Sequence, residues 1–134
     1  MTPAHPLKEK KKFMKIAIIG SRNLTLDDLG QYLPKNCTEI VSGGARGIDT
    51  GAKNYAVTHN IPIKEFLPDY RLHGHKAPLL RNHLIVDYAD EVYAFWDGRS
   101  RGTVHVINYA RQTGKPVKVF RLRKQQTEKG FDKP

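Results

Sequence analysis

Short apolar runs that alternate with turns and helical patterns constrain the fold of this chain more than any other feature of its sequence. We place strands at 15–20, 39–42, 61–67, 91–96 and 117–120, and helices at 25–33, 48–59, 77–88 and 103–113. The run Ile16-Ala17-Ile18-Ile19 has no polar residue to face solvent, which is typical of a strand buried on both sides. The alternation predicts a parallel sheet covered by helices on both faces. We therefore expect a Rossmann-like, three-layer α/β/α fold with a five-stranded parallel sheet in the order 3-2-1-4-5.

The spacing of apolar residues predicts which side of each helix faces the core. In the first helix, Thr25 is the expected cap and Pro34 the stop. The inward residues that the spacing predicts are Leu26, Leu29 and Leu33 in the first helix, Ala52, Tyr55 and Ala56 in the second, and Leu80, Leu84, Ile85 and Tyr88 in the third.

The length of 134 residues suits one domain with a single core. We expect a disordered basic arm over 1–14, a domain over 15–121 and a charged tail over 122–134. The net charge of +10 is concentrated at the ends, with +4 in residues 1–15 and +3 in residues 121–134. Such ends bind polyanions loosely, but they do not make the domain itself a nucleic-acid groove.

The composition favours a cytoplasmic protein. No apolar run approaches the roughly 20 residues that cross a bilayer, and no apolar segment of a secretion signal follows the N-terminal lysines. Cys37 is the only cysteine, so no internal disulfide can form.

The loop Ser42-Gly43-Gly44-Ala45-Arg46-Gly47-Ile48-Asp49 is the strongest candidate for a binding site. It joins a predicted strand to a predicted helix, where free N–H groups attract anions such as phosphate. Its glycines permit a close ligand, and Arg46 carries a guanidinium suited to the same anion. Taken alone, the glycines would serve a tight turn equally well.

Two further turns repeat this arrangement at the ends of the first and fourth strands. Parallel strands place their carboxyl ends on one edge, so we expect the three turns to converge on a phosphate-bearing ligand. Arg81 and Asn82, near the start of the third predicted helix, can reach the same edge. The candidate ligand-binding residues are Gly20, Ser21, Arg22, Ser42, Gly43, Gly44, Arg46, Gly47, Asp49, Arg81, Asn82, Asp97, Gly98, Ser100, Gly102 and Thr103.

Several polar and aromatic residues near this edge have two interpretations. Asp49 lies in the first turn of a helix, where a carboxylate is stabilised by the dipole, so a structural role is favoured over catalysis. Asp97 can accept a ribose hydroxyl or hold Mg²⁺ through water, or form a turn with its own loop. Tyr70 and Trp96 are candidates to stack on a base. His73 and His75 alone make a weak metal site, and we expect none.

These motifs together resemble the SLOG superfamily of Rossmann-like nucleotide-binding proteins. The likeness runs from about Lys15 to Phe120, and the segments Pro68-Asp69-Tyr70 and Phe95-Trp96-Asp97-Gly98 look most like its small, single-domain YspA-type branch. That resemblance implies a nucleotide or nucleotide-derived ligand. The string Ser42–Asp49 is also similar to the DNA-processing protein DprA, which binds single-stranded DNA.

The LOG-type phosphoribohydrolases of the same superfamily carry a catalytic glutamate shortly after Gly-Thr. Here Gly102-Thr103 leads to Val106 at that position, and an apolar side chain cannot act as a general acid or nucleophile. Arg81 does match the arginine that this branch uses beside its substrate.

Our leading hypothesis from the sequence is a protein that binds a nucleotide or a related phosphate compound. The alternatives are DprA-like binding of single-stranded DNA, and hydrolysis of a nucleoside 5′-monophosphate without the usual glutamate. Whether any reaction is catalysed stays open. The resemblance also implies a homodimer, for which we expect a seam at Val104 and Ile107.

Overall fold

The computed structural model describes residues 13–44 and 46–123. Within these residues, none of the helices combines the length and the apolar character that crossing a bilayer requires. Most of the predicted arm over 1–14 and of the predicted tail over 122–134 lies outside the described residues. The first strand begins one residue inside the predicted arm, at Met14.

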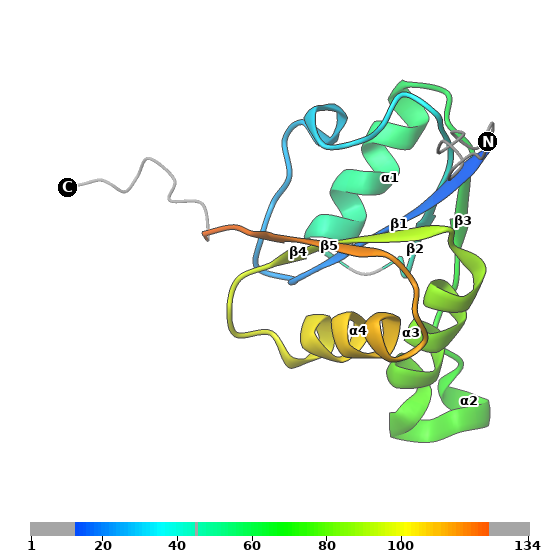
Figure 1. Ribbon diagram of the computed structural model, residues 1–134. Coiled ribbons are helices and arrows are strands. Elements are labelled where there is room, and N and C mark those ends of the chain that lie inside the picture. The colour runs from blue at the N-terminus through cyan, green and yellow to red at the C-terminus, as the bar shows by residue number, and fades with distance from the viewer. Residues whose placement is uncertain (1–12, 45, 124–134) are drawn as a thin grey trace, which may run out of the picture.

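A parallel sheet with strand order β3-β2-β1-β4-β5 forms the middle layer, which confirms the predicted fold (Figure 1). Its strands are β1 (Met14–Gly20), β2 (Cys37–Ser42), β3 (Ile63–Glu65), β4 (Glu91–Trp96) and β5 (Val117–Arg121). The central strand β1 pairs with β2 on one side and with β4 on the other. The order of strands reverses between β1 and β4, and that reversal opens a crevice at their carboxyl ends.

Helices cover both faces of this sheet. They are α1 (Ile48–Thr58), α2 (Tyr70–His73), α3 (Ala77–Tyr88) and α4 (Arg101–Gln112), with the 3₁₀ turns η1 (Leu29–Gln31) and η2 (Gly74–Lys76). Helix α1 lies on one face together with η1, and helices α3 and α4 lie on the other (Figure 1).

Two apolar clusters, one on each face of the sheet, form the core. Alternate residues of β1 enter opposite clusters: Ile16 and Ile18 pack toward α1, whereas Ala17 and Ile19 pack toward α3 and α4. All four side chains are buried, so this part of β1 needs no polar position. This two-sided burial explains the uninterrupted apolar run in the sequence.

The predicted helix over 25–33 is wrong. The segment is mostly irregular and forms only η1, in which the Asp28 carboxylate accepts from the Gly30 amide. Gly30 disfavours a helix there, and a Cβ at this position would lie 2.7 Å from the hydroxyl of Tyr55. Its leucines nevertheless pack against the core as predicted, Leu29 fully and Leu26 and Leu33 in part. The inward residues were therefore correct and the conformation was not.

The third helix was placed correctly over 77–88, but its predicted inner face is partly wrong. Ile85 is buried, whereas Leu80 and Leu84 are exposed. The helix rests on the sheet through Ala77, Ile85 and Val86. The segment between β3 and this helix contains the short helix α2 and the turn η2.

Candidate functional site

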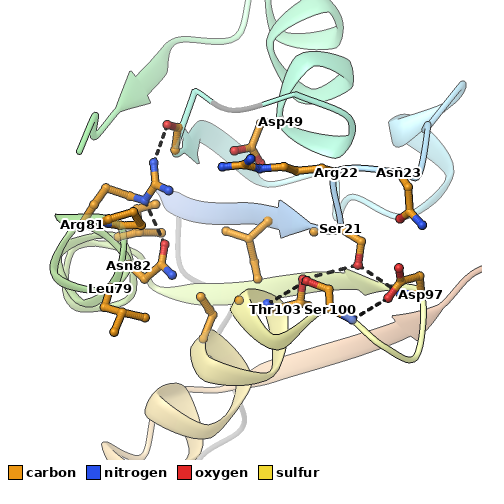
Figure 2. A pocket seen from close by; sticks show the side chains of 17 residues that line it. Ser21, Arg22, Asn23, Asp49, Leu79, Arg81, Asn82, Asp97, Ser100 and Thr103 are labelled. Atoms are coloured by element: carbon orange, nitrogen blue, oxygen red, sulfur yellow. Dashed lines mark hydrogen bonds between the residues drawn. The ribbon is translucent and has the colours of Figure 1, made fainter. Parts of the chain in front are cut away.

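A pocket of about 480 Å³ opens at the carboxyl ends of β1 and β4 (Figure 2). Its walls come from the loops after β1, β2 and β4 and from the first turns of α3 and α4. Most of the residues predicted for a ligand line it: Gly20, Ser21, Arg22, Gly43, Asp49, Arg81, Asn82, Asp97, Ser100, Gly102 and Thr103. The structure therefore brings the three turns together, as the strand order requires. Whether they bind a ligand stays a prediction.

Ser21 joins the loops that follow β1 and β4. Its backbone N–H donates to the Phe95 carbonyl at 3.0 Å, and its Oγ accepts from the Asp97 amide at 3.2 Å. The hydroxyl of Thr103 lies 3.5 Å from the same Oγ and 3.1 Å from that of Ser100. Ser21 and Thr103 are both buried. These hydroxyls hydrogen-bond to each other, so they shape the pocket floor more than they offer donors to a ligand.

Asp97 forms a turn with its own loop, which is the structural alternative that the sequence left open. Its Oδ1 accepts from the amides of Arg99 and Ser100, each at 2.8 Å. These amide donors lower the pKa of the carboxyl. Ser100 in turn caps α4 by accepting from the Thr103 amide. The Asp97 carboxylate thus fixes the loop that presents the start of α4 to the pocket.

Arg81 connects the segments that form the opposite wall of the pocket. Its Nη1 donates to the Gly43 carbonyl at 2.6 Å and to the Phe66 carbonyl at 3.3 Å, while Nε donates to Oδ1 of Asn82 at 2.9 Å. Burial lowers its pKa, and the nearby carboxylate of Asp49 opposes this shift in part. A Cβ on Gly43 would sit 2.6 Å from Nη1, so glycine is needed for the guanidinium to approach. Arg81 therefore braces the pocket as well as adding positive charge to it.

Gly47 allows the glycine-rich loop to pack closely against the loop that follows β1. It directly precedes α1 with φ of 73°, and a Cβ there would lie 2.5 Å from the Arg22 carbonyl oxygen. No side chain caps α1. Its first turn instead carries Asp49, which is buried beside the Arg22 side chain (Figure 2). This placement agrees with the structural role that the sequence favoured for Asp49.

Other predicted site residues lie away from the pocket. Arg46 is exposed and does not line it, so the guanidinium expected from this loop is contributed instead by Arg22. Gly98 packs against the guanidinium of Arg121, on the side of β5. Ser42, Gly44 and Gly47 shape the loop without lining the pocket: Ser42 is buried and accepts from the Gly44 amide at 3.2 Å.

The two stacking candidates also differ from expectation. Tyr70 is 56% exposed and lies outside the pocket lining. Trp96 donates from its ring to the Ser100 carbonyl at 3.2 Å and lies under the guanidinium of Arg121. Trp96 therefore supports the β4 loop.

An apolar wall of the pocket was missed from the sequence. Pro78 and Leu79 come from the start of α3, and Ile85 and Val106 contribute from the two helices below. Asn23, which follows Arg22 directly, was missed as well. Val106 was considered only as the position of a missing glutamate, and it does line the pocket, where its apolar side chain offers no acid or base. The pocket lining thus combines two arginines and two carboxylates, Asp49 and Asp97, with apolar side chains, a mixture suited to a ligand that has both a charged and a less polar part.

Comparison with known proteins gives matches of three kinds. Residues 6–63 match the family described as DNA recombination-mediator protein A. Gene 61 protein of Mycobacterium phage D29 is 38% identical over 84 residues, which cover 58% of this chain and 67% of that protein. DNA processing protein A from Helicobacter pylori, described for its single-stranded DNA binding mode, superposes with a TM-score of 0.63 at 26% identity. That superposition covers 84% of this chain and 67% of the Helicobacter protein.

The family match spans β1, β2 and the glycine-rich loop, and the structural match covers most of the chain. Both agree with the resemblance read from the sequence, in which DprA was the more distant member. The chain therefore belongs to the DNA recombination-mediator protein A-like family of the SLOG superfamily.

Proposed function

We propose that this protein binds single-stranded DNA through the pocket at the carboxyl ends of β1 and β4. The observation that carries the proposal is the placement of Arg22 and Arg81 on this pocket, built by the glycine-rich loop that lies in the matched family segment. The relative from Helicobacter pylori, which is described as binding single-stranded DNA, supports the same function. A cytoplasmic location would follow from this function.

The pocket chemistry suits a strand whose bases are unpaired. A guanidinium forms paired hydrogen bonds with phosphate oxygens, and Arg22 is exposed at the rim, where a phosphate can reach it. The apolar wall of Pro78 and Leu79 offers a surface against which a base can pack. A duplex would keep its bases stacked inside, so the pocket favours a single strand.

Fluorescence anisotropy with a labelled oligothymidylate of about 16 nucleotides tests this function. Because hydrogen bonds to charged groups contribute about 1.5–3 kcal/mol, Arg22→Ala should weaken binding roughly 10- to 100-fold. The salt dependence should also fall by about 0.7 in the logarithmic slope for the lost phosphate contact. Arg111→Ala is the matched control, because Arg111 is exposed in the last turn of α4, at the opposite edge of the sheet.

The control separates the pocket from the general positive charge of the chain. Both variants lose one positive charge, so binding through the basic ends would be reduced equally by the two. Equal losses, or no binding by the wild type at low salt, would reject the pocket as the DNA site.

A second candidate is the binding of a free nucleotide or a nucleotide-derived phosphate, which the sequence suggested first. A cavity of about 480 Å³ that is lined by both charged and apolar side chains suits a ligand of that size. Calorimetry with AMP, ADP-ribose, NAD and cyclic nucleotides tests it, with Arg22→Ala as the pocket variant. A nucleotide that binds and displaces the oligonucleotide would identify one shared site, and the absence of heat with all of them would reject this second candidate.

A further inference from the structure

The positive charge of the domain is concentrated in its last segment. Residues 98–123 carry seven Lys or Arg and no Asp or Glu, whereas residues 13–97 carry nine Lys or Arg and ten Asp or Glu. Four of the seven are exposed arginines at the carboxyl ends of β4 and β5 and at the start of α4, which we call the arginine patch: Arg99, Arg101, Arg121 and Arg123. The charge excess therefore lies at the same edge of the sheet as the pocket.

The arginine patch adjoins the pocket directly. Ser100 and Gly102 line the pocket, whereas Arg99 and Arg101, which alternate with them in the sequence, do not. Both arginines are exposed, so their side chains lie outside the pocket wall, next to its rim. A strand that leaves the pocket beside the start of α4 meets these two guanidinium groups first.

Trp96 holds Arg121 in a position suited to an anion. The Cζ of Arg121 lies 5.8 Å from the centre of the Trp96 ring, and the guanidinium also packs against Gly98. Trp96 is itself fixed by its hydrogen bond to the Ser100 carbonyl. Stacking on a ring uses the flat face of a guanidinium and leaves the N–H donors in its plane available to a phosphate.

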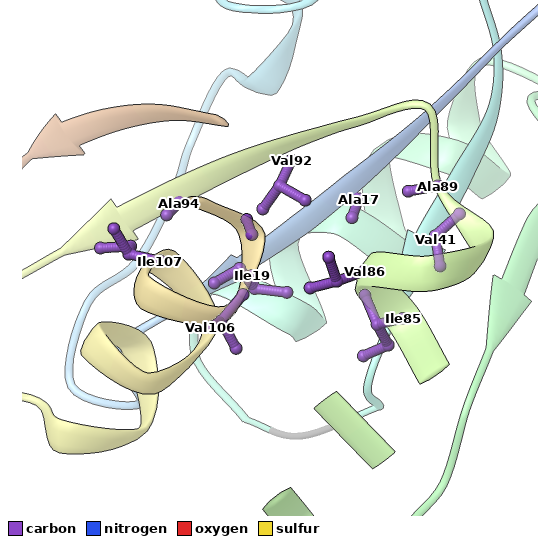
Figure 3. Close-up of a cluster of buried hydrophobic side chains, with 11 residues drawn as sticks. Ala17, Ile19, Val41, Ile85, Val86, Ala89, Val92, Ala94, Val106 and Ile107 are labelled. Carbon is purple, nitrogen blue, oxygen red and sulfur yellow. The ribbon is translucent and has the colours of Figure 1, made fainter. Parts of the chain in front are cut away.

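Helix α4 presents a positive charge at its start and turns its apolar residues toward the sheet. Val106, Ile107 and Ala110 pack in the core (Figure 3). Ile107, which the sequence predicted at a dimer seam, is only 5% exposed and not available to a partner, so that prediction is wrong. The first turn of α4 contains Arg101 and no acidic residue, although the helix dipole favours an anion there. An anion bound beside Arg101 would offset this unfavourable charge.

The β3 end of the same edge has mixed charge. Glu65 ends β3 and lies 4.0 Å from Lys53, and Asp69 caps α2, which contains Arg71. A polyanion that left the pocket in this direction would meet carboxylates as well as cations. At the β5 end, the Asp97 carboxylate accepts from two amides of its own loop and the other charges are arginines. The charges therefore favour the path toward β5.

We propose that a single strand bound in the pocket continues across the carboxyl ends of β4 and β5, with its phosphates on the arginine patch. This inference rests on the function proposed above, and it adds that the ligand is a polymer of several nucleotides rather than one free nucleotide. The pocket takes a nucleotide, and the patch binds only the backbone, so the patch adds affinity without selecting a base sequence.

Fluorescence anisotropy with labelled oligothymidylates of about 2 to about 16 nucleotides tests this path. We expect the affinity of the wild type to rise with strand length. Arg99→Gln/Arg101→Gln should bind the shortest strand as the wild type does, but the longest roughly 10- to 60-fold less tightly at about 50 mM salt, because each lost phosphate contact removes about 0.7 from the logarithmic salt slope. Arg22→Ala, in the pocket, should weaken the binding of every length.

A matched control and a measurement of folding separate this path from other effects. Arg111→Gln/Lys118→Gln removes two exposed charges from the same segment, in the last turn of α4 and near the start of β5, and should leave the affinity for the long strand nearly unchanged. Thermal unfolding followed by circular dichroism should show Arg99→Gln/Arg101→Gln to be as stable as the wild type or slightly more so, since a cation leaves the start of α4.

Two results would overturn the path and leave the pocket standing. One is a wild-type affinity that does not rise with strand length, and the other is an equal loss of affinity for the long strand in the two double variants. A wild type that binds none of the strands at low salt would instead reject the pocket and the path together. The two proposals can therefore fail in distinguishable ways.

Discussion

Substitution of Gly47 by alanine tests the packing that builds the pocket. Gly47 has φ of 73°, and its missing Cβ would lie 2.5 Å from the Arg22 carbonyl oxygen. Two separate penalties follow. The backbone of Gly47, with φ of 73° and ψ of −121°, disfavours alanine by about 1–3 kcal/mol, and forcing a methyl group against a neighbouring backbone costs about 1–3 kcal/mol more. We therefore expect Gly47→Ala to lower the free energy of unfolding by about 2–6 kcal/mol.

Two other glycines separate these penalties. Gly114, after α4, has φ of 76° but open space where a Cβ would be placed, so Gly114→Ala measures the cost of a positive φ without a steric clash. Gly102, in the first turn of α4, has open space and no positive φ, so Gly102→Ala should be neutral or slightly stabilising. Urea unfolding of the three variants, followed by circular dichroism, gives the free energies directly.

The order of the three variants is the decisive result. If Gly47→Ala is no more destabilising than Gly114→Ala, the contact between the Gly47 loop and the Arg22 loop is not tight, and the reasoning about the pocket is refuted. If both match Gly102→Ala, the positive φ angles themselves are in question.

The other predictions concern pH and the open side of the pocket. The pKa of Asp97 is lowered by the amides of its own loop, so its contribution to the free energy of unfolding is fully present above the ordinary value of 3.8 and is lost as the pH falls through the lower, folded value. Urea titrations below pH 3.8 should therefore show a shallower loss of stability in Asp97→Asn than in the wild type. Burial, and then the neighbouring His83, lowers the pKa of His105, so the neutral ring favours folding above the ordinary value of 6.5 and this contribution is lost as the pH falls below it. His105→Phe should therefore lose less stability than the wild type as the pH falls below 6.5. An unchanged dependence of stability on pH would contradict this role of His105. Gly102→Leu should fold normally but weaken oligonucleotide binding in the anisotropy assay, because its side chain enters the open pocket; an unchanged affinity would show that the DNA does not reach the start of α4.

The sequence alone predicted the layers, the strand order and most elements. Strand β4 and helix α3 were predicted with the bounds that they have in the structure. The reason is that the apolar run of β4 and the helical spacing of α3 are both set by neighbouring residues in the sequence. The convergence of the three turns on one edge also followed from the sequence, since the reversal of strand order dictates it.

Contacts between distant segments decided the rest. The segment around Leu29 packs its leucines as predicted yet forms only a short turn, because Gly30 disfavours a longer helix and Asp28 caps the turn. Leu80 has the spacing of a core residue, but α3 rests on the sheet through Ala77, Ile85 and Val86, which leaves Leu80 at the surface. Arg81 could be placed near the pocket from the sequence, whereas its role as a brace between Gly43 and Phe66 required the loops to be in position.

The sequence by itself therefore determined which elements form and at which edge of the sheet their loops meet. Only the tertiary structure decided which arginine lines the pocket, Arg22 and not Arg46, and which leucines of α3 remain exposed. The physical reason is that the periodicity of a helix or strand fixes which of its residues share a face. It does not fix what that face meets, which depends on how elements far apart in the chain pack against one another.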